Sequence, residues 1–177
     1  MTNYEKAYEQ IRPWLGKLAE PREIQFLGRL WRVDQGGVDR LSGPPAHVNC
    51  KSVLVWYFTF GGQGEPSYEF VPLHGFSHGI FRENDWETGA CATLTLDGFR
   101  AVSARLGADF LRRARYGEAW LLRALPKLPA LLTYSEADEE FPATLDIKYG
   151  ANATTFLPFE SLAVLNGLIR AEYRERE

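Results

Sequence analysis

Apolar side chains recur every three or four residues near the start of the chain, and this spacing predicts an amphipathic helix over residues 3–19. Pro21 ends that helix, because proline cannot continue the helical hydrogen bonds. Apolar and polar residues then alternate over Ile24–Asp34, which predicts a strand. A glycine-containing turn at 35–37 leads to a short returning strand at Val38–Leu41.

The middle of the chain carries weaker patterns. Residues 47–60 are apolar enough to form either a buried helix or a buried strand. Residues 68–81 read as an extended segment with breaks at Gly75 and Gly79. Helices are predicted at Asp97–Leu106 and Ala108–Arg115, separated by Gly107.

The last third of the chain has the clearest order of parts. Two apolar runs, Ala130–Tyr134 and Ala143–Tyr149, predict strands on either side of the acidic turn Ser135–Phe141. A closing helix is expected over 159–174, directly after Pro158. Because strands and helices do not alternate as βαβ units, we predict an α+β fold with a mostly antiparallel sheet and flanking helices.

This last third also resembles a known family. The run LPKLPALLTYSEADEEFPA, the strand after it and the helix start LP…E…LAVL resemble DUF3786, an uncharacterised bacterial and archaeal domain of unknown function. The resemblance is most specific over residues 125–169. It implies an α+β domain, a helix at 47–60 and a strand at Glu118–Leu125.

The resemblance also implies a setting in anaerobic one-carbon metabolism. Some members are fused to a cysteine-ligated iron–sulfur domain of the kind found beside corrinoid proteins. This chain has only two cysteines and therefore lacks that cluster, so a redox partner would be a separate protein.

Composition limits the class of protein. A length of 177 residues with 45% apolar side chains fits one globular domain over 1–177. A net charge of −3 argues against a nucleic-acid or anionic-membrane binder, and the arginines between 100 and 115 are expected on solvated helix faces. Without a signal-peptide pattern or an apolar run of membrane length, we expect a soluble, cytoplasmic protein.

Histidine placement suggests a metal site. The three histidines and one of the two cysteines fall close together in the sequence: His47, Cys50, His74 and His78. Imidazole and thiolate bind zinc or iron, and His47 and Cys50 would share a face if this segment were helical from residue 47. The spacings nevertheless favour ordinary histidines in a loop and a helix, because the sequence lacks the paired short spacing of a structural zinc site.

Two polar segments are further candidates. The carboxylates at 136–140 could bind a hard cation, but a solvated hairpin tip is favoured because the spacing lacks the pattern of a calcium loop. In the segment before the last helix, Asn152, Thr155 and Glu160 could bind a ligand. The resemblance implies that relatives carry Asp, Ser and often His at positions 150, 152 and 155 and share Glu160. Because this chain lacks that Asp and His, capping by Asn152 and Thr155 is favoured here.

These observations favour a non-catalytic cytoplasmic accessory protein. Its ligand would be a metal or a small cofactor, for example a tetrapyrrole-like one, held by the histidines and neighbouring rings. An enzyme whose site forms only in three dimensions and a protein–protein adaptor with an aromatic docking surface remain as alternatives.

Overall fold

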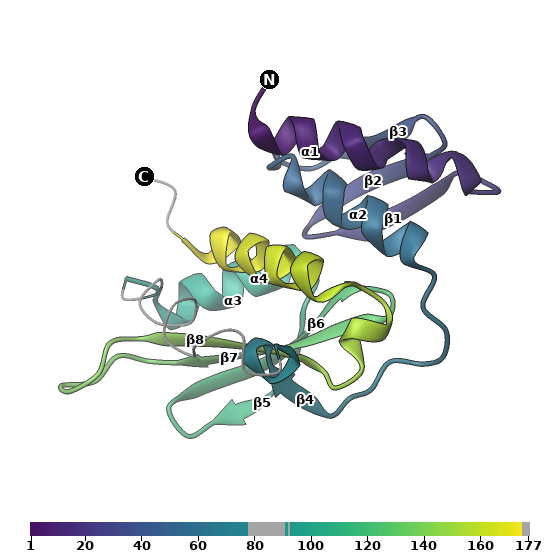
Figure 1. Ribbon diagram of the computed structural model, residues 1–177. Helices are drawn as coiled ribbons and strands as arrows, with labels where there is room; N and C mark the ends of the chain where they lie inside the picture. Colours follow the sequence, from purple (N-terminus) through teal and green to yellow (C-terminus); the bar gives the residue numbers. More distant parts are fainter. Residues whose placement is uncertain (78–90, 92, 175–177) are drawn as a thin grey trace.

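In the part of the chain that the structure describes, two antiparallel sheets and four α-helices make up the fold (Figure 1). The computed structural model describes residues 1–77, 91 and 93–174. A three-stranded sheet, in the order β1-β2-β3, lies with α1 and α2 in the N-terminal part. A five-stranded sheet, in the order β4-β8-β7-β6-β5, lies with α3 and α4 in the rest. The predicted α+β class, with antiparallel strands and a C-terminal helix, is therefore confirmed.

The first predicted helix is divided into two pieces. Helix α1 spans Asn3–Ile11 and begins with a capping box between Thr2 and Glu5, in which each side chain accepts a backbone N–H of the other residue. A 3₁₀ helix, η1, continues over Arg12–Lys17. Pro13 lies in its first turn and explains the change, because proline supplies no N–H for an α-helical bond.

The predicted strand over 24–34 is two strands. β1 (Arg22–Phe26) and β2 (Arg29–Asp34) form a hairpin whose two-residue turn is Leu27-Gly28, and Phe26 pairs with Arg29. Both turn residues have positive φ, 50° and 70°, which matches the twist of a tight hairpin. Strand β3 spans Gly37–Ser42 and pairs with β2, which confirms the returning strand predicted at 38–41.

The ambiguous segment at 47–60 is helical, in agreement with the resemblance. Helix α2 spans Asn49–Phe60 and buries one side, while Val48 precedes it. The extended segment predicted at 68–81 is shorter: β4 covers Phe70–Pro72 and a 3₁₀ helix, η2, covers Leu73–Phe76. The predicted break at Gly79 lies outside the described residues.

Helix α3 (Leu96–Leu106) confirms one prediction, but the helix predicted at 108–115 is wrong. Gly107 has φ 81° and ends α3 in the left-handed region, where glycine is favoured. The chain then forms strand β5 (Asp109–Ala114), which pairs antiparallel with β6 (Gly117–Leu125). Its arginines therefore lie on a sheet edge rather than on a helix face.

The centre of the large sheet follows the predicted hairpin. β7 (Leu128–Ser135) pairs with β6 on one side and with β8 (Thr144–Gly150) on the other. A short 3₁₀ helix, η3 (Ala153–Thr155), leads into α4 (Phe159–Tyr173). Within the described residues, no helix combines the length and the apolar character needed to cross a membrane.

One hydrophobic cluster connects the two sheets. It contains buried residues of the small sheet, such as Trp31 and Val33, together with residues of the large sheet, such as Leu132 and Tyr149. Helices α2 and α4 pack against each other between these parts. This packing brings the end of α4 close to the turns of the small sheet, where the candidate site lies.

Candidate functional site: a groove between α3 and α4

A buried arginine joins the small sheet to the last helix. The Arg29 side chain is only 1% exposed, and its guanidinium donates to the backbone oxygens of Leu27, Pro44 and Pro45 at 2.6 to 3.0 Å. It also donates to the Glu172 carboxylate at 2.7 Å. A buried charge needs such partners, because an uncompensated ion in the interior is costly.

Local geometry puts Arg29 in this position. It follows the Leu27-Gly28 turn directly, so its side chain starts at the end of the small sheet that faces α3. The turn itself packs closely on α3: a Cβ built on Gly28 would lie 2.7 Å from the Arg105 carbonyl oxygen. Glycine is needed there both for this approach and for its positive φ.

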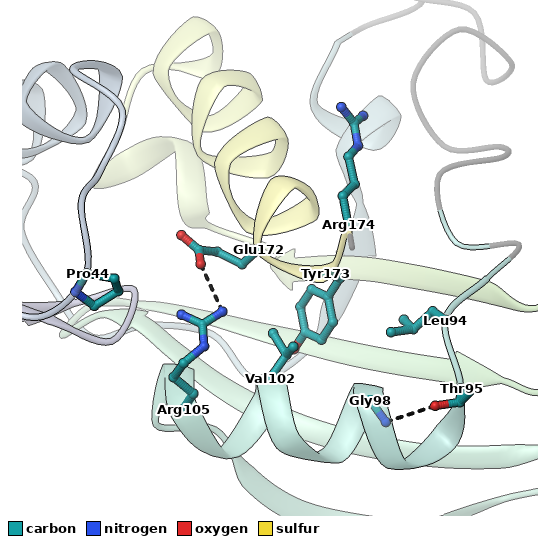
Figure 2. A pocket seen from close by; sticks show the side chains of 9 residues that line it. All are labelled: Pro44, Leu94, Thr95, Gly98, Val102, Arg105, Glu172, Tyr173 and Arg174. Atoms are coloured by element: carbon teal, nitrogen blue, oxygen red, sulfur yellow. Dashed lines mark hydrogen bonds and ion pairs between the residues drawn. The ribbon is translucent and has the colours of Figure 1, made fainter. Parts of the chain in front are cut away.

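Glu172 binds two arginines, one with each oxygen. Oε1 accepts from Arg29, and Oε2 accepts from the Arg105 guanidinium at 2.9 Å (Figure 2). The Glu172 side chain is 10% exposed, whereas that of Arg105 is 37% exposed. We call these three residues the arginine–glutamate junction. It holds two positive charges and one negative charge, so positive charge is in excess.

A groove of about 370 Å³ opens beside this junction, between α3 and the end of α4 (Figure 2). This volume is at the lower end of the range for small-molecule sites. The residues that line it come from the loop after β3, from α3 and the two residues before it, and from the end of α4: Pro44, Leu94, Thr95, Gly98, Val102, Arg105, Glu172, Tyr173 and Arg174.

The floor of the groove is rigid and mostly apolar. The Tyr173 ring stacks on Phe99 with centroids 5.6 Å apart, and its hydroxyl lies 2.8 Å from the Ser103 hydroxyl. Burial raises the pKa of Tyr173, so this hydroxyl stays protonated and serves as a structural hydrogen-bond partner. Gly98 adds no side chain to the groove wall, and the Thr95 hydroxyl accepts its N–H at 3.1 Å.

The chemistry of the groove suits binding better than catalysis. Both oxygens of Glu172 are occupied by arginines, which leaves this carboxylate unsuited to take a proton from a substrate. Arg174 is exposed at the rim and forms no ion pair with any described residue. Arg105 has N–H groups beyond the one that binds Glu172, and these can donate charge-assisted hydrogen bonds to an anion whose apolar part lies on Val102 and Tyr173. The Arg174 side chain points away from Arg105 (Figure 2).

The structure places the His47 and Cys50 side chains in different surroundings, although the Cys50 N–H donates to the His47 oxygen at 3.0 Å. Helix α2 begins at Asn49, so His47 precedes it; its Nδ1 accepts the Asn49 N–H at 3.1 Å and its ring contacts Tyr4. His47 is exposed, whereas Cys50 is 2% exposed inside the core. Burial raises the pKa of Cys50 to about 12, so the residue is a protonated thiol rather than a thiolate ligand at neutral pH. The shared helical face is expected only for a helix that includes His47, and α2 begins two residues later.

The other two predicted ligands lie after β4. His74 is in η2, which packs against α4, β4 and β8, and His78 lies outside the described residues. Among the residues that the structure does describe, no three side chains of the His, Cys, Asp or Glu type gather into a group that could hold a metal ion. The four-residue metal site stays a prediction.

Asn152 has a structural contact that the sequence did not suggest. Its side-chain oxygen accepts the Ser67 N–H at 2.8 Å, and its amide nitrogen donates to the Glu65 oxygen at 2.9 Å. It therefore fixes the loop before β4. No side chain caps η3 or α4, so the predicted capping is wrong. Thr155 and Glu160 are exposed near the start of α4, and their role in ligand binding stays a prediction.

Sequence reasoning missed the arginine–glutamate junction. Arg29 and Glu172 are 143 residues apart, and each looks like an ordinary charged position in its own segment. The one local signal is Pro44-Pro45, whose carbonyl groups follow a turn and can accept hydrogen bonds, but nothing in the sequence says that Arg29 provides them.

Comparison with known proteins identifies a family but no activity. The family model described as Domain of unknown function (DUF3786) matches residues 14–171. The match includes α3 and all strands of both sheets, and it ends one residue before Glu172. No curated protein and no solved structure matches the chain.

Proposed function

The chain belongs to the DUF3786 family, whose description gives no activity, and from this premise we propose that it is a non-catalytic binding protein for a small anion with an apolar body. The α3–α4 groove is the binding site in this proposal. One observation carries it: an apolar groove of about 370 Å³ is bordered by Arg105 and Arg174, while the single carboxylate beside them is already shared by two arginines.

The anion would lie at the Arg105 guanidinium on α3, near the end of α4, and the exposed Arg174 side chain, which points away in Figure 2, would turn toward it. A carboxylate or sulfonate accepts hydrogen bonds from guanidinium groups, and these bonds are stronger than neutral ones. The apolar body would cover Val102 and the Tyr173 ring, so that burial of its surface adds to affinity. Gly98 supports this pose because a larger residue would narrow the groove.

Titration of ¹⁵N-labelled protein with 8-anilinonaphthalene-1-sulfonate, a small aromatic anion, tests the proposal. We expect amide shifts concentrated on Thr95, Gly98 and Arg174. The variant Arg105→Gln/Arg174→Gln should bind at least about tenfold more weakly, because two charge-assisted contacts are lost. The control Arg123→Gln removes an exposed charge that is paired with Asp109 on the large sheet, and it should bind like the native protein.

Shifts distributed over other surfaces, or an unchanged affinity in the double variant, would refute the groove as the site. The neutral probe N-phenyl-1-naphthylamine separates charge from apolar contact. It should bind much more weakly than the sulfonate to the native protein and equally weakly to the double variant.

The more specific parts of the functional hypothesis also belong to this proposal. They are a cytoplasmic accessory role in anaerobic metabolism, one domain over 1–177, and a metal or tetrapyrrole-like cofactor held through His47, Cys50, His74 and His78. The shared hydrophobic cluster supports the single domain, and the sequence spacing supports the metal. Elemental analysis and a visible spectrum of protein purified without oxygen would distinguish a metal or coloured cofactor from a colourless anion.

A further inference from the structure

Strand β5 forms one edge of the large sheet and exposes most of its side chains. It is last in the order β4-β8-β7-β6-β5, so among the strands that the structure describes only β6 pairs with it. Phe110, Leu111 and Tyr116, at the strand and its following turn, are 50 to 57% exposed. Exposed rings on a strand edge are unusual, because natural sheets protect such edges against association.

The same edge carries a concentration of unpaired positive charge. Arg112, Arg113 and Arg115 are all exposed, and none of them forms an ion pair with a described residue. Arg115 stacks on the Tyr116 ring at 5.0 Å instead. We call residues 110–116 the basic edge. It is a local exception in a chain whose net charge is −3.

The turn between β7 and β8 carries the opposite, negative charge. Residues 136–141 are all exposed, and Phe141 is 65% exposed at the end of the turn. Asp138 organises the turn, since its side chain accepts the N–H groups of Glu140 and Phe141 at 2.9 and 2.7 Å. Glu136, Glu139 and Glu140 form no ion pair with any described residue. We call residues 136–141 the acidic loop.

The basic edge and the acidic loop lie at the same end of the large sheet. The Glu136 N–H donates to the Tyr116 oxygen at 2.8 Å, which ties the two turns together. In Figure 1, the β7–β8 hairpin extends beyond the turn between β5 and β6. The acidic loop is therefore carried past its own basic edge, where it can contact another molecule.

We propose that two copies of this chain form a two-fold symmetric dimer in which the acidic loop of each copy lies against the basic edge of the other. A two-fold interface needs a patch that is complementary to itself, and adjacent patches of opposite charge satisfy this condition. Phe110, Tyr116 and Phe141 would supply the apolar surface that charged contacts alone lack.

The charges select this arrangement over simple edge-to-edge pairing of two β5 strands. Such pairing would bring the arginines of both copies together, and like charges across an interface oppose association. Loop-to-edge contact pairs each arginine with a carboxylate. Because these charges are at the surface, the dimer is expected to weaken as salt rises.

Charge reversal on each side tests the proposal. The variant Arg112→Glu/Arg115→Glu changes the charge of the basic edge from +3 to −1, so that both patches are acidic. The variant Glu139→Lys/Glu140→Lys changes the charge of the acidic loop from −4 to zero, so that it no longer attracts the basic edge. Arg113 stays unchanged because it lies opposite Glu118 in the strand register. Asp138 stays unchanged because its side chain accepts hydrogen bonds that hold the loop. Sedimentation equilibrium at low and high salt measures association, and thermal unfolding confirms that each variant is folded.

We expect the native protein to dimerise at low salt and each variant alone to dimerise at least about tenfold more weakly. An equimolar mixture of the two variants should form a heterodimer with higher affinity than either variant has for itself, because it keeps one native loop-to-edge contact. The control Arg22→Glu/Arg32→Glu makes the same charge change on exposed residues of the small sheet and should dimerise like the native protein.

Three results would overturn the proposal. They are a native protein that stays monomeric at high concentration and low salt, a dimer insensitive to both reversals, and a mixture of variants that does not associate.

Discussion

The buried Arg29 side chain has many partners. Arg29 uses four of its donor contacts on three backbone oxygens and one carboxylate, and its side chain is 1% exposed. Arg32, three residues along the same strand, is half-exposed and pairs only with Asp34. Two arginines of one strand therefore differ sharply in what their removal should cost.

Arg29→Met should lower the free energy of unfolding by roughly 3–5 kcal/mol, because it leaves buried acceptors and the Glu172 carboxylate without their main donor. Arg32→Met is the matched control and should change it by less than about 1 kcal/mol. Urea unfolding followed by tryptophan fluorescence measures both. Equal losses in the two variants would contradict the structural role of Arg29.

A second buried carboxylate makes stability depend on pH. The Arg100 guanidinium, which donates to Glu118 at 2.5 Å, lowers the pKa of Glu118, and the Trp120 indole N–H adds to the effect. A group whose pKa is lowered in the folded state stabilises the fold above its unfolded pKa. That contribution is lost as the pH falls through the folded pKa.

Glu118→Gln should therefore reduce stability most at neutral pH, and the difference from the native protein should shrink below about pH 4. Urea unfolding at a series of pH values provides the measurement. Glu9→Gln, which changes an exposed helix residue paired with Arg12, should behave like the native protein throughout. A Glu118→Gln effect that is the same at every pH would rule out this linkage.

Among the elements, turns decide where the strands lie. The Leu27-Gly28 turn divides one apparent strand into a hairpin and sets Gly28 against α3. At Gly107 the left-handed conformation ends α3, and β5 begins two residues later. In both places a glycine with positive φ precedes a strand that carries arginines.

Gly28→Ala should destabilise the protein by roughly 1–3 kcal/mol, since the new methyl group would press on the Arg105 carbonyl and the residue would keep a positive φ. Gly16→Ala is the control, because a Cβ at Gly16 meets nothing within 4 Å. Thermal unfolding compares them. The hairpin would not depend on this glycine if both variants melted at the same temperature.

In the whole molecule, the two surfaces for which we propose ligand binding and dimerisation lie on the large sheet and its helices. The α3–α4 groove is next to the junction with the small sheet. The basic edge and the acidic loop lie at the strand ends and on β5, outside the residues that line the groove. Ligand binding and dimerisation can therefore be tested with variants that share no residue.

Most regular elements could be predicted from local patterns. Helix α1 and strand β8 each bury one face, and the residues of that face recur at short, regular intervals in the sequence. Residues 108–115 show the limit. Their sequence suits a helix as well as a strand, and pairing with β6 decided between them.

The candidate site could not be predicted in the same way. The histidines drew attention because they are close in sequence, but His47 is exposed outside α2 while Cys50 is buried inside it. The partners of Arg29 come from a turn, a proline loop and the last helix, as far as 143 residues away. No local pattern records such contacts.

The sequence by itself determined the α+β class, the family and the hairpin of β7 and β8, because these depend on periodicity and turn residues within short segments. Only the tertiary structure decided that β5 is an edge strand and that Glu172 lies between two arginines. The physical reason is that hydrogen bonds and buried charges join side chains through space. Their energies depend on packing that neighbouring residues alone do not specify.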